Sequence, residues 1–144
     1  MFKKDKRKKN SSRLDTLIGQ NTDIEGNVNF SGGLRVDGSI TGNISTKDEN
    51  AVLTLSEQGR LKGEVKAPNM VINGTITGNI YASQHLELAP QAKIHGNVYY
   101  HLLEMAVGAE INGQLIHVAE GNDDILNIDH EVIDDKNNLR LPPE

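Results

Sequence analysis

The chain has 144 residues, a formal net charge of −5 and a polar composition, with 36% hydrophobic and 3% aromatic residues, 14 Gly and no Cys or Trp. The lack of Cys excludes a disulfide scaffold, a thiolate metal site and a Cys nucleophile. No apolar run approaches the ~20 residues that span a bilayer, and no signal-peptide core follows the basic start, so we expect a cytoplasmic protein.

Charge divides the chain into three segments. Residues 1–13 carry a net charge of +6, residues 14–119 carry −5 and residues 120–144 carry −6. Charged segments with few apolar residues are typically solvated. We therefore predict a basic arm (1–13), one folded domain (14–119) and an acidic flexible tail (120–144). Within the tail, Ile125, Ile128 and Val132 are spaced to form one weak amphipathic turn on binding a partner.

The arm comes first along the chain and suits an anionic membrane surface. Each basic group near such a surface contributes about 1 kcal/mol, and Phe2 adds a shallow apolar anchor. The predicted membrane-binding residues are Met1, Phe2, Lys3, Lys4, Lys6, Arg7, Lys8 and Lys9. A merely solubilising arm and binding to nucleic-acid phosphates remain alternatives, although no aromatic residues interleave the basic ones to stack on bases.

The middle segment is an internal repeat. Residues 53–65, 86–98 and 103–115 share the pattern apolar-x-apolar-x-x-x-small-x-apolar-x-Gly-x-apolar; residues 16–28 fit it, and residues 34–44 and 70–80 follow a version two residues shorter. Apolar residues at every second position predict short strands with one buried face. A unit of 16–19 residues cannot bury that face alone, so stacked units are expected. The variable length favours a right-handed parallel β-helix of about six coils over the left-handed form.

One template position is Gly in every copy, either for a bend with positive φ or to leave room in a narrow interior. These structural glycines are Gly26, Gly42, Gly63, Gly78, Gly96 and Gly113. The residues that follow them, mostly Asn, are predicted to stack into a polar ladder between coils. A further column is predicted to hold Asn29, Ser45, Lys66, Tyr81, Tyr99 and Ile116. If it faces outward, its apolar half either serves lateral or partner contacts or covers a corner.

The sequence resembles the bactofilins, a bacterial family of cytoskeletal proteins. The resemblance rests on the start MFKKDKRKK, the repeated apolar-x-Gly-x-apolar core from Thr16 to Val118 and the polar tail ending in LRLPPE. It implies a right-handed β-helix that forms filaments without nucleotide, often at the inner face of the cytoplasmic membrane. It also implies a scaffold for cell-wall enzymes and cell-shape determination.

The residues themselves favour assembly through the ends of the β-helix. A parallel coil leaves unpaired backbone groups and exposed core at both ends, and proteins that stay monomeric blunt such edges. No amphipathic capping helix precedes Thr16 or follows the sixth copy. The candidate polymerisation residues, which equally suit an ordinary core, are Leu17, Ile18, Ile24, Val28 and Phe30 at the first coil, and Leu103, Met105, Ile111, Leu115 and Val118 at the last.

Enzymatic function is not expected. No phosphate-binding loop motif is present, the outward acidic residues are dispersed, and the five His do not form a stacked metal-ligand set, so we predict no catalytic residue, metal or cofactor. The predicted partners are further copies of the chain, the membrane and cell-wall or other morphogenetic proteins. Two alternatives stay open: a DNA-associated scaffold that uses the arm, and a β-helix enzyme acting on carbohydrates.

Overall fold

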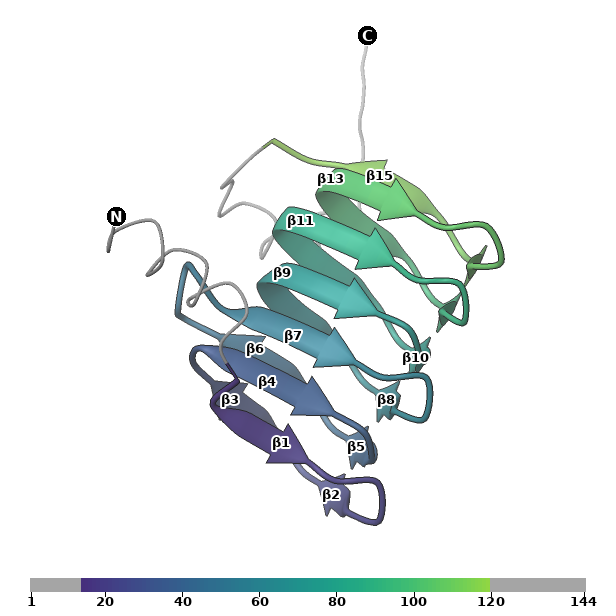
Figure 1. Cartoon of the computed structure of the whole chain (residues 1–144). Coiled ribbons are helices and arrows are strands. Elements are labelled where there is room, and N and C mark those ends of the chain that lie inside the picture. The colour runs from purple at the N-terminus through teal and green to yellow at the C-terminus, as the bar shows by residue number, and fades with distance from the viewer. Residues whose placement is uncertain (1–13, 120–144) are drawn as a thin grey trace, which may run out of the picture.

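The computed structural model describes residues 14–119, which form six stacked coils. All regular elements in this range are β-strands, and every strand pairing is parallel. Figure 1 shows the coils rising from coil 1, in purple, to coil 6, in green. The chain winds as a right-handed parallel β-helix, as predicted. The predicted arm and tail lie outside the described residues.

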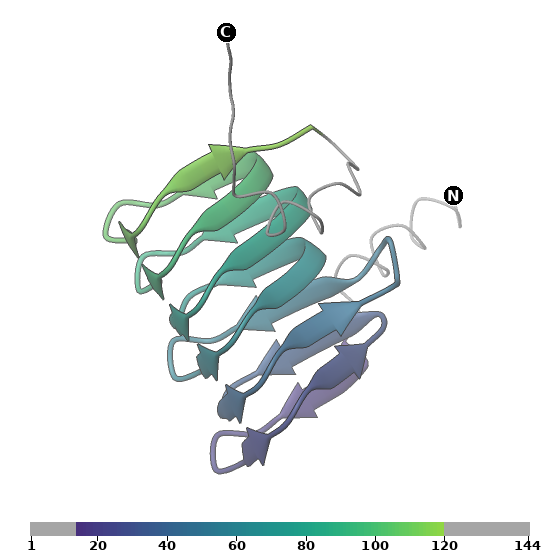
Figure 2. The same cartoon turned by 180° about the vertical axis from the view of Figure 1, so that it is seen from behind.

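Each coil contributes to three faces. Face 1 holds β1 (Thr16–Ile18), β4 (Gly33–Val36), β7 (Val52–Leu55) and the second halves of β9 (Val65–Ile72), β11 (Ile80–Leu88) and β13 (Val98–Met105). Face 2 holds β2 (Asp23–Glu25), β5 (Ser39–Thr41), β8 (Arg60–Lys62), β10 (Thr75–Thr77), β12 (Lys93–His95) and β14 (Glu110–Asn112). Face 3 holds β3 (Val28–Phe30), β6 (Ile44–Thr46), the first halves of β9, β11 and β13, and β15 (Leu115–His117). Figure 2 shows the stack from behind.

The strand register follows the sequence repeat. The first residues of the six repeat copies pair in succession on face 1, in the order Thr16, Leu34, Leu53, Met70, Leu86 and Leu103. The apolar position two residues before the template Gly pairs in the same way on face 2, from Ile24 to Ile111. The predicted stacking of one repeat copy per coil is therefore confirmed.

The interior is filled by columns of aliphatic side chains. One column on face 2 runs through Ile40, Leu61, Ile76 and Ile94, which are all buried. Side chains of this size fill the space between three closely spaced faces, and the dense packing leaves no room for wider groups. At the corner between faces 3 and 1 the column contains Ala67 and Ala82, with the larger Phe30 and Tyr100 packed nearer the two ends.

The presence of Gly at one position of every repeat copy has two structural causes. Five of the six, Gly113 excepted, have φ between +132° and +155°, a conformation that side chains rarely tolerate. In each coil after the first, a Cβ at this position would collide with the carbonyl oxygen of the Gly one coil earlier. The six Gly therefore form a column, here called the glycine column, in which backbone packs directly on backbone.

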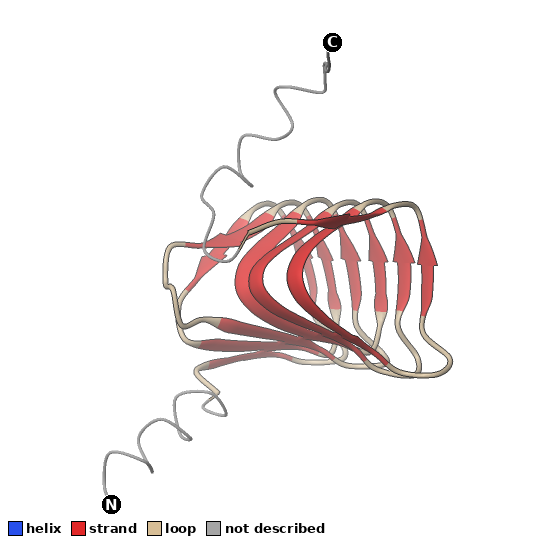
Figure 3. Ribbon diagram, turned by 90° about the horizontal axis from the view of Figure 1, so that it is seen from above, coloured by secondary structure: helices blue, strands red, loops and turns tan. Residues whose placement is uncertain are grey.

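Two kinds of corner join face 3 to face 1 of the next coil. In the later coils β9, β11 and β13 run through the corner without interruption, with a register shift between Ala82 and His85, and Figure 3 shows them as curved ribbons. Between β6 and β7 the chain instead makes a loop anchored by Asp48. Its carboxylate accepts hydrogen bonds from the N–H groups of Asn50 (2.9 Å) and Gly32 (2.8 Å). These two bonds lower the pKa of Asp48 below its usual value, and the bond from Asn50 has the larger effect.

Candidate assembly interface

The interior columns end without a cap at the C-terminal end of the described stack. Along face 1, Val36, Leu55, Ile72 and Leu88 are fully buried, and Met105, the next residue in the column, is 46% exposed. Apolar core is therefore presented at this end of the stack.

A second interior column also changes from buried to exposed at coil 6. Along face 3, Ile44, Val65, Ile80 and Val98 are buried, whereas Leu115 in coil 6 is 46% exposed. Leu103 and Ile111 complete this end and are half-buried against the core.

The N-terminal end is partly open. Ile18 is 7% exposed and belongs to the core, while Ile24, Val28 and Phe30 are half-buried on coil 1. Leu17 points away from the interior, because it pairs with the exposed Arg35 on the outer side of face 1, and it is largely exposed. No strand among residues 14–119 covers coil 1 from outside the stack.

The large exposed apolar side chains of residues 14–119 all lie on the two terminal coils. Leu14 and Leu17 belong to coil 1, and Leu102, Met105, Val107 and Leu115 belong to coil 6. Single exposed apolar side chains are ordinary on protein surfaces. Their restriction to the two ends of a rod, where the backbone edges are also unpaired, is the pattern expected of surfaces that meet other subunits.

Three of these residues were missed by the sequence prediction. Val107, which is 96% exposed, occupies a turn position where the aligned copies have Glu57 and Pro90, and an apolar residue in a polar turn was a usable signal. Leu102 pairs with His85 at a corner, outside the repeat template. Leu14 precedes the first copy, so the template gave no information about it.

The amide ladder runs along the corner between faces 2 and 3. The Asn27 Oδ1 atom accepts a hydrogen bond from the Asn43 N–H (2.9 Å), and Asn43 Oδ1 accepts one from the Glu64 N–H (3.1 Å). The ladder resumes at Asn79, whose Oδ1 accepts from the Asn97 N–H, and Asn97 Oδ1 in turn accepts from the Gln114 N–H. Each amide thus bonds to the backbone of the next coil rather than to the next side chain.

The neighbouring outward column of face 3 ends in an apolar cluster. The Tyr81 and Tyr99 rings stack with centroids 4.7 Å apart, and Val118 and Ile116 pack against them. Tyr81 is flanked by the inward, fully buried Ile80 and Ala82, so its own side chain faces outward. Val118 therefore lies on face 3, in what we call the tyrosine cluster (Tyr81, Tyr99, Ile116 and Val118), rather than on the end of the stack.

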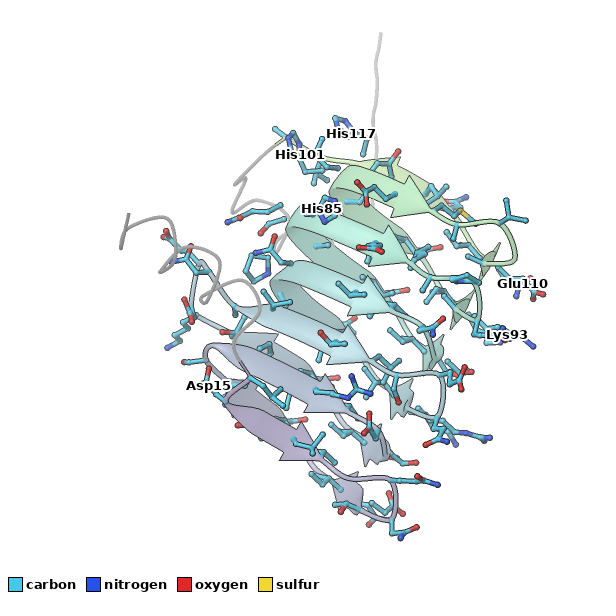
Figure 4. All side chains as sticks on the ribbon, viewed as in Figure 1. Asp15, His85, Lys93, His101, Glu110 and His117 are labelled. Carbon is cyan, nitrogen blue, oxygen red and sulfur yellow. The ribbon has the colours of Figure 1, made fainter. Side chains whose placement is uncertain are left out.

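Three histidines lie near the C-terminal end of the described stack. Figure 4 shows His101 and His117 close together there, with ring centroids 5.5 Å apart. His101 Nδ1 bonds to the Val118 carbonyl oxygen (3.0 Å), which orients its ring. Within residues 14–119, no three His, Asp or Glu side chains converge to hold a metal ion.

The predicted membrane-binding residues 1–9 lie outside the described part of the chain, so the structure does not place them. Over residues 14–119 no helix has the length and apolar character needed to cross a bilayer.

Over residues 14–119 the chain is a parallel β-helix with no strand capping either end, which places it in the class of β-solenoid proteins. The model of the bactofilin family, described as polymer-forming cytoskeletal, matches residues 16–116, so the chain belongs to the bactofilin family. This is a structural, cytoskeletal family rather than an enzymatic one.

Known relatives agree with this assignment. The chain is 29% identical over 101 residues to bactofilin BacO of Myxococcus xanthus, a match that covers 70% of this chain and 78% of BacO. It is 26% identical over 106 residues to bactofilin BacP of the same organism, covering 73% of this chain and 43% of BacP. A solved structure of Thermus thermophilus bactofilin in double helical filaments shares the fold, with a TM-score of 0.63 and 23% identity over 72% of this chain and all of that one.

Proposed function

We propose that the chain assembles end to end into a filament without nucleotide, and that the filament serves as a scaffold at the inner face of the cytoplasmic membrane. The observation that carries this proposal is the exposed apolar core at the C-terminal coil, in columns that are fully buried one coil earlier. The family's polymer-forming character and the filaments of the Thermus thermophilus bactofilin support it.

The end contact would continue interactions that the stack already uses. Burying Met105, Leu115 and their neighbours removes apolar surface from water at about 25 cal/mol per Å². The unpaired backbone groups of the terminal strands would gain partners in the same step. Two like ends meeting would give a filament without polarity, and unlike ends meeting would give a polar one. Neither arrangement needs a bound nucleotide.

The test of assembly is electron microscopy of the purified chain without nucleotide. We expect filaments from the unchanged protein and short particles from Leu115→Glu, because a charge would be buried at the contact. Thr77→Glu, which adds the same charge to an exposed position of a central coil, is the matched control and should leave filaments intact. Filaments of normal length from Leu115→Glu would remove coil 6 from the interface.

Membrane attachment is assigned to the basic arm. Six basic residues within residues 1–9, repeated on every subunit of a filament, would bind an anionic surface through avidity. We expect the full chain to float with vesicles containing anionic lipid, and a chain lacking residues 1–9 to stay in solution. Equal flotation of both would refute the assignment, and salt-sensitive binding to DNA without binding to vesicles would favour the DNA-associated alternative.

The filament's role would be to gather morphogenetic and cell-wall proteins along the membrane. The proposed contribution is geometric: a stiff, repeating surface on which partners are held close together. Co-purification of cell-wall enzymes with assembled filaments, lost with the assembly-defective Leu115→Glu chain, is the expected result.

A further inference from the structure

The outer surface of face 2 carries opposite charges on its first and third coils. Coil 1 presents Asp23 and Glu25 on β2. Coil 3 presents Arg60 and Lys62 on β8, and all four residues are exposed. The members of each pair flank an inward aliphatic residue of their strand, so their side chains point outward. Figure 1 shows β2, β5 and β8 lying one above the other.

The strand register sorts these charges into two outward columns. Each column has an acidic residue on coil 1, a small hydroxyl residue on coil 2 and a basic residue on coil 3: Asp23, Ser39 and Arg60 in one, and Glu25, Thr41 and Lys62 in the other. The acidic and basic residues of one column stand two coil spacings apart, ~9.6 Å. Within residues 14–119, none of the four charged side chains forms a hydrogen bond or an ion pair. This surface therefore carries a charge order that is complementary to its own reverse.

We propose that coils 1 to 3 of face 2 bind the same surface of a second copy of the chain, with the two stacks running in opposite directions. A two-fold axis that lies in the interface, parallel to β5, places coil 2 opposite coil 2 and coil 3 opposite coil 1. Arg60 then faces Asp23 of the second copy, and Lys62 faces Glu25 of the second copy. The symmetry of such an isologous contact repeats both pairs, so four ion pairs form.

The same charges disfavour a parallel arrangement of the two stacks. A two-fold axis along the stack would place every coil opposite itself. Arg60 and Lys62 would then face the basic residues of the second copy, and the carboxylates of coil 1 would face each other. Like charges across an interface repel and suppress the wrong docking geometry. The charge order therefore selects the antiparallel arrangement.

Coil 2, at the centre of the contact, lets the two faces approach. Its outward residues on β5 are Ser39 and Thr41, whose side chains are short. Sheets packed face to face lie ~10 Å apart, a distance that the longer side chains of coil 3 help to span. Asp37, in the turn before β5, is already paired with Arg35 (3.0 Å), so it does not place an unpaired negative charge beside the axis.

The other acidic residues beside β8 do not oppose the contact. Glu57 precedes the strand and Glu64 follows it, and Glu64 is paired with Lys66 (3.8 Å). The corresponding residues of the coil 1 repeat are the uncharged Gln20 and Asn27. Because coil 3 faces coil 1 of the second copy, neither glutamate meets a carboxylate there.

This side contact is separate from the proposed end contact. It uses one face of the stack and leaves both ends accessible, and coils 4 to 6 of each copy extend past coil 1 of the other. Exposed ion pairs are individually weak, but copies arrayed along a filament would add their contributions through avidity. Salt screens exposed pairs, so end-to-end assembly can be followed at high salt without the side contact.

Cysteine cross-linking of the full chain, which has no natural Cys, tests the arrangement. Thr41→Cys is treated with a short bis-maleimide linker at low salt, and Thr77→Cys is the matched control, an exposed threonine of the same outward column. The proposed axis places the two Thr41 positions opposite each other and separates the two Thr77 positions by ~19 Å along the stack. We expect a two-chain product from Thr41→Cys only. Equal yields from both, or no product from either, would overturn the proposal.

Charge reversal in the Thr41→Cys chain tests the ion pairs. Arg60→Glu with Lys62→Glu should abolish the two-chain product. Arg35→Glu with Lys47→Glu makes the same change of charge at exposed positions away from face 2 and should preserve it. Equal loss from the two double variants would show a general effect of net charge and contradict the contact.

A complete charge swap then provides the rescue. Adding Asp23→Arg and Glu25→Lys to the Arg60→Glu and Lys62→Glu chain should restore the two-chain product, because every pair again joins opposite charges. If the basic residues instead serve a different anionic partner, such as a nucleic acid, the swap would not restore it, and docking of a second copy would be wrong.

Two further variants separate this proposal from end-to-end assembly. Arg60→Glu with Lys62→Glu, in the chain without added Cys, should still form filaments of normal length that no longer pair side by side in electron micrographs. Thr41→Cys combined with Leu115→Glu should still give the two-chain product at high protein concentration. Absence of the product from that chain would overturn a side contact that is independent of the ends.

Discussion

At the scale of single residues, the glycine column lets neighbouring coils keep the spacing that their inter-strand hydrogen bonds require. The missing Cβ lets the backbone of one coil approach the carbonyl oxygen of the Gly below it, and every coil after the first uses this contact. Gly26 differs from the others. It has a positive φ, but a Cβ added there would meet no other atom within 4 Å. A substitution at Gly26 would therefore cause backbone strain without a steric collision.

This difference gives a matched pair of variants. Gly26→Ala should destabilise the fold by about 1–3 kcal/mol through backbone strain alone. Gly78→Ala has the same kind of strain and a collision with the Gly63 carbonyl, and should cost at least about 2 kcal/mol more. Thermal unfolding followed by circular dichroism measures both. Equal losses would show that packing within the column is not limiting.

Asp48 gives a residue-scale prediction for pH. Its pKa is lowered in the folded chain by the N–H groups of Asn50 and Gly32, so its stabilising contribution is present above the usual value of 3.8 and is lost as the pH falls through the folded value. Asp48→Asn should therefore destabilise the protein at neutral pH, and the difference from the natural chain should shrink below pH 3.8. Unfolding midpoints measured over this range test it; a constant difference would contradict it.

At the scale of elements, the coil is the unit that the sequence specifies. The period-two pattern and the Gly at one template position were enough to predict the register, which pairs Leu34 with Leu53 and Ile76 with Ile94. The uninterrupted corners of β9, β11 and β13 were not predictable, because residues such as Ala67 to Asn69 lie between the template copies and have no periodic signal.

The end surfaces were predictable in outline only. The repeat indicates which side chains end each interior column, and Met105 and Leu115 follow directly from it. How far each is exposed depends on the turns around it, which is why Ile18 is buried and Val107 projects into solvent. Val118 lies beyond the last copy, so its place on face 3 depends on contacts with Tyr81 and Tyr99 that only the folded stack creates.

The amide ladder makes an element-scale prediction. Asn43→Ala removes the acceptor of the Glu64 N–H and should destabilise the fold by about 0.5–1 kcal/mol, since the N–H can turn to water instead. Gln114→Ala is the control, because its side chain stands on coil 6 with no further coil of this chain to bond. Chemical denaturation measures the two changes, and an equal loss from Gln114→Ala would show that the side chain rather than the ladder bond matters.

At the scale of the whole molecule, stability should vary along the rod. Central coils are covered on both sides by neighbouring coils, whereas coils 1 and 6 are each covered on one side only by the described chain. Local opening is easiest where buried contacts are fewest. The same two coils should therefore exchange their amide hydrogens fastest in unassembled protein.

Hydrogen exchange before and after assembly tests this gradient. On forming filaments, protection should increase at β2 and β14, in the terminal coils, and remain nearly constant at β8 and β10 in the centre. Protection gained along all the strands of one face instead would indicate side-by-side association and contradict an end contact.

Because the interior columns repeat from coil to coil, the length of the subunit can change without a change in the residues at its ends. Each interior coil presents the same columns to the coils above and below it, so duplicating residues 70–85 would insert one more turn between two compatible neighbours. The terminal coils would be unchanged, while the molecule would grow by ~4.8 Å. In a filament joined through the proposed end contacts, the repeat distance between subunits would then change in whole turns while the contacts stayed the same.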